Sequence, residues 1–199
     1  MVEQCFHKAV VGRSNRPAGK KMPIFKAKNE NFFKKWSPEM AYVLGFFCAD
    51  GSMIKNKRGA HFIEFDTIDK LLLEKIKNNL DSDHKISARK RAAQWSTAYR
   101  LQIGSKMIFN DLLKIGFVPN KSKRINLPKM PTKYLSHFIR GYFDGDGHVS
   151  ISNYIRKTRR NKKARTILSG FTSCSRNFLE NLHSRLKQFA QIVGVFHLE

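Results

Sequence analysis

The sequence predicts an α+β fold built from two related halves, each combining helices with antiparallel strands. Three observations indicate this. Two apolar helical segments both end in Asp-Gly, strand-like stretches follow each of them, and two later amphipathic helices repeat the same apolar positions. Recurrence of one order of elements at a nearly constant spacing is typical of an internal duplication.

The two apolar helices carry the clearest repeat. Gly45 corresponds to Gly141 and Asp50 to Asp146, both at a spacing of 96 positions (141 − 45 and 146 − 50). Glycine inside a helix costs about 1 kcal/mol relative to alanine, so a repeated glycine predicts close backbone packing. We therefore expect the two helices to pair and their aspartates to meet at one end. The two stretches are YVLGFFCADGSM at 42–53 and FIRGYFDGDGHV at 138–149.

The remaining elements are expected in the following order. Residues 1–36 form a basic lead-in, either flexible or a DNA-contacting arm, that becomes ordered near Phe32-Phe33. The first half then has a helix over 38–50 capped by Ser37 and a hairpin of strands 52–57 and 61–66. A helix beginning at Thr67 follows, and its apolar stripe consists of Leu71, Leu72, Leu73, Ile76 and Leu80. The half ends with a hairpin of strands 85–93 and 96–103 and a helix from Ser105 to Gly116.

The second half is shorter than the first. From Phe65 and Phe171 onward the spacing is 106, so the hairpin after the second motif is about ten residues longer, with a basic run at 156–165. At this spacing residue 199 corresponds to residue 93 (199 − 106). The second half therefore has no counterparts of the strand at 96–103 and the helix at 107–116. Either the repeat is abbreviated or the chain is truncated, and an apolar edge strand at 192–198 favours truncation. The predicted domains are 1–36, 37–127 and 128–199.

Composition points to a nucleic-acid partner. The chain has 38 Lys and Arg against 15 Asp and Glu, a formal net charge of +23. No apolar run is long enough to span a membrane, and we expect no membrane partner. The three cysteines are isolated and suggest neither a disulfide framework nor a zinc site, which predicts a reduced, cytoplasmic or organellar setting.

The paired motifs resemble those of the LAGLIDADG homing endonucleases, in the two-motif, monomeric form. The resemblance implies two pseudo-symmetric αββαββα half-domains packed through the motif helices, with antiparallel DNA-binding sheets. It also implies that Asp50 and Asp146 bind the catalytic metals together with the backbone carbonyls of Ala49 and Gly145. The cofactor would be two or three Mg2+ ions, with Mn2+ or Ca2+ as substitutes for binding. Cys48 stands where the second motif has Asp144.

Two other interpretations of the aspartates are available. Asp-Gly is common at helix ends and in turns, although carboxylates at a helix C-terminus are disfavoured by the helix dipole. A calcium loop is excluded, because Val149 stands at the position that requires glycine and Ile155 at that of the closing glutamate.

Lys121 is a further catalytic candidate. The family has a basic residue near the active site that positions water or polarises the phosphate, and the segment GFVPNKS resembles the turn that carries it. A lysine in a surface turn is the alternative interpretation.

DNA recognition is expected on the strands, because a β-ribbon fits the major groove. Alternation in the second hairpin places Val149, Ile151 and Ile155 on an apolar face and polar residues on the other. The candidate DNA contacts are Lys55, Lys57, Arg58, Lys85, Arg89, Arg91, Arg100, Gln102, His148, Ser150, Ser152, Tyr154, Arg156, Lys157, Arg159 and Arg160. A solvated charged face is the alternative for each basic residue.

The function predicted from these features is site-specific, Mg2+-dependent double-strand cleavage of a long DNA target, in intron or intein homing. An RNA maturase or a non-cleaving nucleic-acid-binding protein on the same fold is the alternative. A basic rRNA-binding structural protein would explain the charge but not the two Asp-Gly helix ends.

Overall fold

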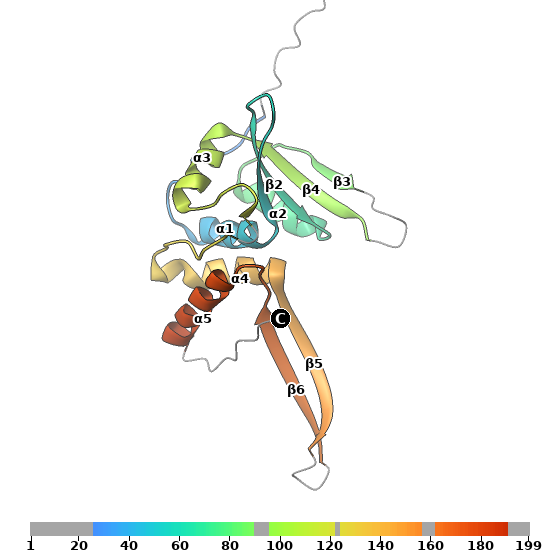
Figure 1. Ribbon diagram of the computed structural model, residues 1–199. Coiled ribbons are helices and arrows are strands. Elements are labelled where there is room, and N and C mark those ends of the chain that lie inside the picture. Colours follow the sequence, from blue (N-terminus) through green and yellow to red (C-terminus); the bar gives the residue numbers. More distant parts are fainter. Residues whose placement is uncertain (1–25, 90–95, 122–123, 157–161, 191–199) are drawn as a thin grey trace, which may run out of the picture.

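Two helices, α1 (Pro38–Asp50) and α4 (Leu135–Asp146), lie side by side at the centre of the molecule and separate two sets of strands (Figure 1). The structure is a computed structural model that describes residues 26–89, 96–121, 124–156 and 162–190. Every residue of α1 from Met40 to Cys48 is buried. A helix that is buried all round belongs to the core, which agrees with the predicted helix pairing.

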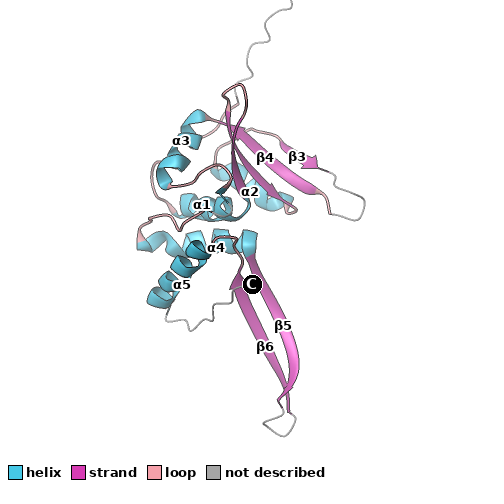
Figure 2. Cartoon of the chain, in the orientation of Figure 1, coloured by secondary structure: helices cyan, strands magenta, loops and turns pink. Residues whose placement is uncertain are grey.

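The first half has the predicted order of helix, two strands, helix, two strands and helix. Its elements after α1 are β1 (Gly51–Lys55), β2 (His61–Thr67), α2 (Lys70–Asn79), β3 (Ile86–Arg89), β4 (Ala98–Gly104) and α3 (Lys106–Ile115). The strands form one antiparallel sheet in the order β1-β2-β4-β3, shown in magenta in Figure 2.

The two faces of this sheet differ in character. Ile63 pairs with Met53 on one side and Ile103 on the other, and all three are buried in the core. Glu64 pairs with Ser52 and Gln102 on the opposite, outward face. The pleat thus separates an apolar face that covers the core from a polar face turned away from it.

Two details of the predicted second helix were wrong. Thr67 ends β2, paired with Tyr99, and α2 begins three residues later because the side chain of Asp69 accepts a hydrogen bond from Leu72 N at 3.1 Å. Leu71 was expected in the apolar stripe, but it lies on the outer face of α2 and is 75% exposed. Leu73, Ile76 and Leu80 enter the core as expected, and Leu72 is partly buried against it.

The described second half contains one hairpin and two helices. A short 3-10 turn, η2 (Thr132–Tyr134), leads into α4, and α4 is followed by β5 (Gly147–Arg156), β6 (Lys162–Phe171) and α5 (Arg176–Ala190). Strands β5 and β6 pair along their full length and project away from the helix pair, opposite the first sheet (Figure 1). Helix α5 is capped by Ser175, whose hydroxyl oxygen accepts a hydrogen bond from Phe178 N at 3.3 Å.

The apolar face predicted for this hairpin is not buried. Val149, Ile151 and Ile155 are each more than half exposed, as are Ile167 and Leu168 on β6. Alternation along β5 therefore separates two faces, but no described layer packs on either of them. The strand expected at 192–198 lies outside the described residues.

The end of the lead-in belongs to the first half. Phe33 is buried in the core, as expected for ordering near Phe32-Phe33, and Asn29 N donates to Leu80 O at 2.8 Å. Residues 1–25 lie outside the described part. Within the described part of the chain, no helix has the length and apolar character needed to cross a membrane.

Candidate active site

The contact between α1 and α4 is made backbone to backbone at two glycines. A Cβ on Gly45 would overlap the carbonyl group of Phe138 and lie 2.9 Å from Tyr142 N. A Cβ on Gly141 would overlap the carbonyl group of Tyr42 and lie 3.0 Å from Phe46 N. The two contacts are related by the same spacing of 96 positions (138 − 42 and 142 − 46), so the sequence repeat is also a local two-fold symmetry.

This packing brings the two Asp-Gly ends together. A Cβ on Gly145 would overlap that of Ala49 and lie 3.4 Å from Asp50 Oδ2, so the Asp50 carboxylate reaches the last turn of α4. Asp50 and Asp146 are the final residues of their helices, and both are partly buried. Gly51 and Gly147 have extended backbones and begin strands, which shows that neither Asp-Gly is a left-handed helix cap.

The electrostatics of the two carboxylates reflect their proximity. Burial raises the pKa of Asp50 to about 6, with a further contribution from the charge of Asp146, whereas Lys121 acts in the opposite direction. Burial also raises the pKa of Asp146, opposed by the Tyr142 hydroxyl and Lys121. Two carboxylates that both resist ionisation near one another form a site that favours an added cation.

Lys121 lies inside this site rather than in a surface turn. Its side chain is buried, and Nζ donates to Cys48 O at 2.6 Å and to Ala49 O at 3.3 Å. Burial lowers the pKa of Lys121, while the neighbouring Asp146 and Asp50 raise it. The ammonium group thus binds the free carbonyls at the C-terminus of α1, where a positive charge is favourable. One of them is the Ala49 carbonyl, which the resemblance of the motifs predicts to bind metal.

Asp144 has a different role from Asp146, two residues later. The Tyr42 hydroxyl donates to Asp144 Oδ2 at 2.6 Å, joining α1 to α4. Lys75 and Arg140 both lie over the Tyr42 ring, at 4.4 and 4.9 Å from its centre. This cluster of contacts around Tyr42 stabilises the packing of α1 against α4. The spacing of the motifs did not predict it.

The donors at the site fit a hard divalent cation. Among the described residues, no group of three or more His, Cys, Asp and Glu side chains could hold a metal by itself. Mg2+ is typically bound by one or two carboxylates, with waters and substrate phosphates completing its coordination. Asp50 and Asp146 would supply the carboxylates, with the carbonyls of Ala49 and Gly145 beside them.

Comparison with known protein families shows which family the first half resembles. Residues 37–115 match the family described as the LAGLIDADG-like domain. This part of the chain is a LAGLIDADG-like domain.

Solved structures extend the LAGLIDADG fold to most of the chain. The meganuclease I-AabMI bound to uncleaved DNA has a TM-score of 0.54 at 15% identity, over 82% of this chain and 76% of that one. I-SmaMI, bound to an uncleaved DNA target in the presence of calcium ions, has a TM-score of 0.53 at 14% identity, over 83% and 76%. At such identities the likeness shows the fold.

The curated relatives that this chain matches are longer proteins. It is 34% identical over 109 residues to a probable translation initiation factor IF-2 of Thermococcus kodakarensis, covering 51% of this chain and 8% of that protein. It is 26% identical over 121 residues to an uncharacterized protein of Methanocaldococcus jannaschii, covering 57% and 40%. The chain therefore spans less than half the length of these relatives.

The candidate DNA contacts of the first LAGLIDADG-like half lie on the outward sheet face and near the ends of its strands. Arg89, Arg100 and Gln102 are on the outward sheet face, and each of the two arginines forms ion pairs within the sheet. Lys55 lies two residues after buried Met53 in β1, so its side chain is on the core face of the sheet, at the end of the strand. Lys57 and Arg58 are exposed in the turn that joins β1 to β2, and Lys85 is exposed just before β3. Arg91 lies outside the described residues.

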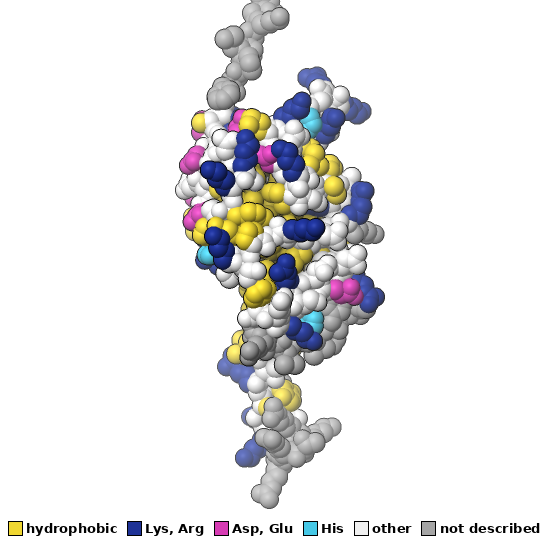
Figure 3. Space-filling view, turned by 90° about the vertical axis from the view of Figure 1, so that its left-hand side faces the viewer, with side chains coloured by type: hydrophobic (Ala, Val, Ile, Leu, Met, Phe, Trp, Pro, Cys, Tyr) yellow, Lys and Arg dark blue, Asp and Glu magenta, His cyan; other side chains and the backbone are white. Residues whose placement is uncertain are grey.

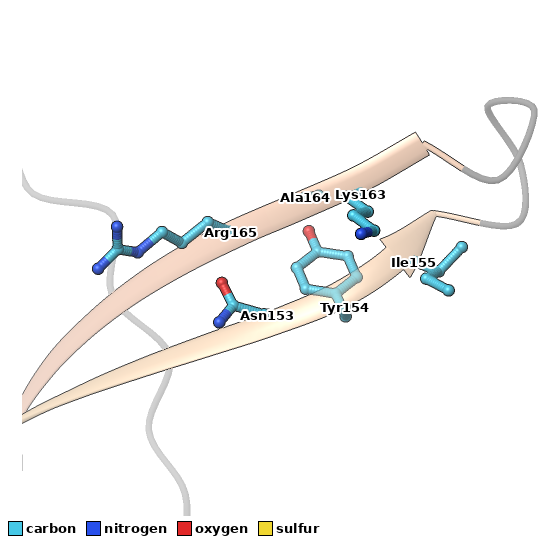
Figure 4. Close-up of a pocket in the computed structure, with 6 residues that line it drawn as sticks. All are labelled: Asn153, Tyr154, Ile155, Lys163, Ala164 and Arg165. Atoms are coloured by element: carbon cyan, nitrogen blue, oxygen red, sulfur yellow. The ribbon is translucent and has the colours of Figure 1, made fainter.

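The candidates of the second half line the projecting hairpin. His148, Ser150, Ser152 and Tyr154 are exposed on β5. Asn153, Tyr154, Lys163 and Arg165 surround a shallow hollow of about 450 Å³ between the two strands (Figure 4). The backbone of Arg156 ends β5, whereas Lys157, Arg159 and Arg160 lie outside the described residues. Basic side chains are spread over both halves on the face shown in Figure 3.

Proposed function

We propose that this protein is a double-strand DNA endonuclease that hydrolyses phosphodiester bonds with divalent metal ions. The observation that supports the proposal best is the meeting of Asp50 and Asp146 at the end of a helix pair held together by backbone contacts. The fold is that of LAGLIDADG structures solved in complex with cleaved DNA and with uncleaved DNA. The net charge of +23 favours a polyanionic substrate.

The chemistry follows from the placement of the two carboxylates. Bound divalent cations would activate water and neutralise charge on the leaving oxygen. Asp50 and Asp146 would hold these cations on either side of the local two-fold axis, so that each acid serves one strand of the duplex. Lys121 would place a positive charge beside the reacting phosphate. Mg2+ is the proposed physiological ion, and Mn2+ or Ca2+ would substitute for it in binding.

The symmetry of the helix pair also bears on the substrate. A monomer with two similar halves can follow a long duplex site, with the first sheet on one side of the cut and the β5–β6 hairpin on the other. We further propose an intracellular, reducing location and a role in the homing of an intron or intein.

The test is cleavage of a randomised duplex DNA library with Mg2+, comparing the parent chain with Asp50→Asn, Asp146→Asn and Asp144→Asn. The first two changes should reduce cleavage roughly 10³-fold, because each removes a metal-binding carboxylate worth several kcal/mol in the transition state. Asp144→Asn is the matched control, since it makes the same chemical change on α4 and keeps an oxygen that can accept from Tyr42.

Site-limited double-strand cuts by the parent and the Asp144→Asn protein, with loss in the other two, would support the proposal. Cleavage that survives Asp50→Asn and Asp146→Asn together would contradict it. Binding of duplex DNA or RNA without cutting by any of the proteins would favour the non-cleaving or maturase alternative.

A further inference from the structure

Glu64 is a buried acid on the sheet face that is turned away from the core. Only 2% of it is exposed, although it lies on the outward face between β1 and β4. Its Oε1 accepts from Gln102 Nε2 and, at 3.4 Å, from Arg100 Nη1. A buried carboxylate is costly unless it is paired and hydrogen-bonded, so both partners are bound to it firmly.

Arg100 is held by a second acid as well. Its Nε donates to Asp66 Oδ1 at 3.0 Å, and Arg89 Nη1 lies 3.8 Å from the same oxygen. Two carboxylates and two guanidinium groups therefore cancel one another in charge on this part of the sheet. A surface for phosphate binding would carry an excess of positive charge, and buried acids would weaken it. The arrangement suits the reading of base edges instead.

We propose that Glu64 is a positioning residue that holds Arg100 and Gln102 as a fixed pair for reading base edges in the major groove. This inference rests on the proposed function, because it requires duplex DNA as the ligand. Glu64 itself does not contact the DNA. It orients the two side chains that do.

The hydrogen bonds to Glu64 determine what each reader presents. A carboxylate only accepts, so the amide nitrogen of Gln102 faces Glu64, and its oxygen and remaining N–H point outward. A donor beside an acceptor matches N7 and N6 of adenine. Arg100 uses Nε and one N–H of Nη1 within the sheet, and its remaining N–H groups match O6 and N7 of guanine.

The spacing of the two readers fits neighbouring bases. Arg100 and Gln102 are two residues apart on one strand and face the same side, so their attachment points are separated by about 6.8 Å. Base pairs are stacked at about 3.4 Å, which places the two contacts about two steps apart. The target should therefore contain a guanine and an adenine at that separation, at positions read by the first half.

The experiment measures base preference rather than cleavage. A randomised duplex library is bound by the full chain in Ca2+, and the bound fraction is sequenced for the parent, Glu64→Gln, Arg100→Leu and Gln102→Leu. Each Leu variant should lose one base preference by about 10-fold, which identifies its position. Glu64→Gln should lose both of these preferences and keep the others. Glu74→Gln is the matched control, because it makes the same change in charge at an exposed site on α2.

A second measurement needs no change to Glu64. In the free parent, the side-chain amide of Gln102, assigned with Gln102→Leu, should be as rigid as the backbone by heteronuclear NOE on the nanosecond timescale. A mobile amide would overturn the inference, as would a Glu64→Gln protein that keeps both preferences or weakens all positions equally. A parent that binds no duplex DNA would instead refute the proposed function, and this inference with it.

Discussion

Replacing Gly45 by alanine should separate the central helices and misplace the two carboxylates. The added Cβ would lie 2.9 Å from two backbone atoms of α4 and closer still to the Phe138 carbonyl oxygen, where ordinary contact begins at 3.4 Å. The helices must therefore move apart by at least 0.5 Å (3.4 − 2.9), and by more than 1 Å to clear the oxygen. Because the obstacle is backbone, no rotamer change can relieve it.

The expected loss of stability follows from two opposing effects. Overpacking of a tight contact costs about 1–3 kcal/mol, and alanine returns about 1 kcal/mol through its higher helix propensity. Because the obstacle is backbone, we take the upper end of this cost, and the net loss of about 2 kcal/mol (3 − 1) corresponds to a decrease in Tm of roughly 4–8 °C for a chain of this size. A displacement of about 1 Å at the carboxylates should reduce cleavage roughly 10²-fold.

Thermal unfolding and single-turnover cleavage are the assays, and Gly104→Ala is the matched control. A Cβ on Gly104 in β4 would lie 3.4 Å from the nearest atom of Phe62, an ordinary contact, so its Tm should remain within about 2 °C of the parent. A Gly45→Ala protein with the Tm and cleavage rate of the Gly104→Ala protein would refute the reasoning.

Three further predictions concern the charges and hydrogen bonds of the site. Since the folded-state pKa of Asp50 is raised to about 6, its ionisation should destabilise the metal-free fold as pH rises from about 4 through 6. Asp50→Asn should therefore raise Tm at pH 7 but not near pH 4, and Mg2+ should raise the Tm of the parent more than that of the Asp50→Asn protein. A Tm difference that is independent of pH would contradict this. Lys121→Met removes the charge that opposes the raised pKa of Asp50, so the acidic limb of the cleavage profile should shift to higher pH, a shift that a purely structural lysine would not cause. Tyr42→Phe should lower the free energy of unfolding by about 1 kcal/mol in urea denaturation through loss of the bond to Asp144, whereas an unchanged value would show that this bond contributes nothing.

The helix pair could be predicted from sequence because the same pattern of glycine and Asp-Gly occurs in both helices. Gly45 and Gly141, each followed five residues later by Asp-Gly, indicate packing and orientation together, and the structure places all four residues as expected. The start of α2 was missed because Thr67 and Asp69 are both able to cap a helix, and only the pairing of Thr67 with Tyr99 assigns it to the strand.

Other features depend on contacts that local patterns do not encode. The hydrogen-bond partners of Glu64 come from β4, more than 30 residues away in the sequence. Their position depends on the register between β2 and β4. Alternation in β5 predicted an apolar face, but whether such a face is buried depends on what packs against it. The position of Lys121 beside Ala49 likewise required the fold, since 72 residues separate them.

The direct passage from each motif helix into a strand links recognition to chemistry mechanically. Asp50 is followed at once by β1 and Asp146 by β5, with no loop in either half. In the proposed endonuclease, a strand that tilts to follow a well-matched groove would carry its carboxylate with it, and a strand displaced by a mismatched base would displace the carboxylate too. A mismatch would then slow cleavage after the DNA has bound, so that fidelity would be enforced at the step of cleavage.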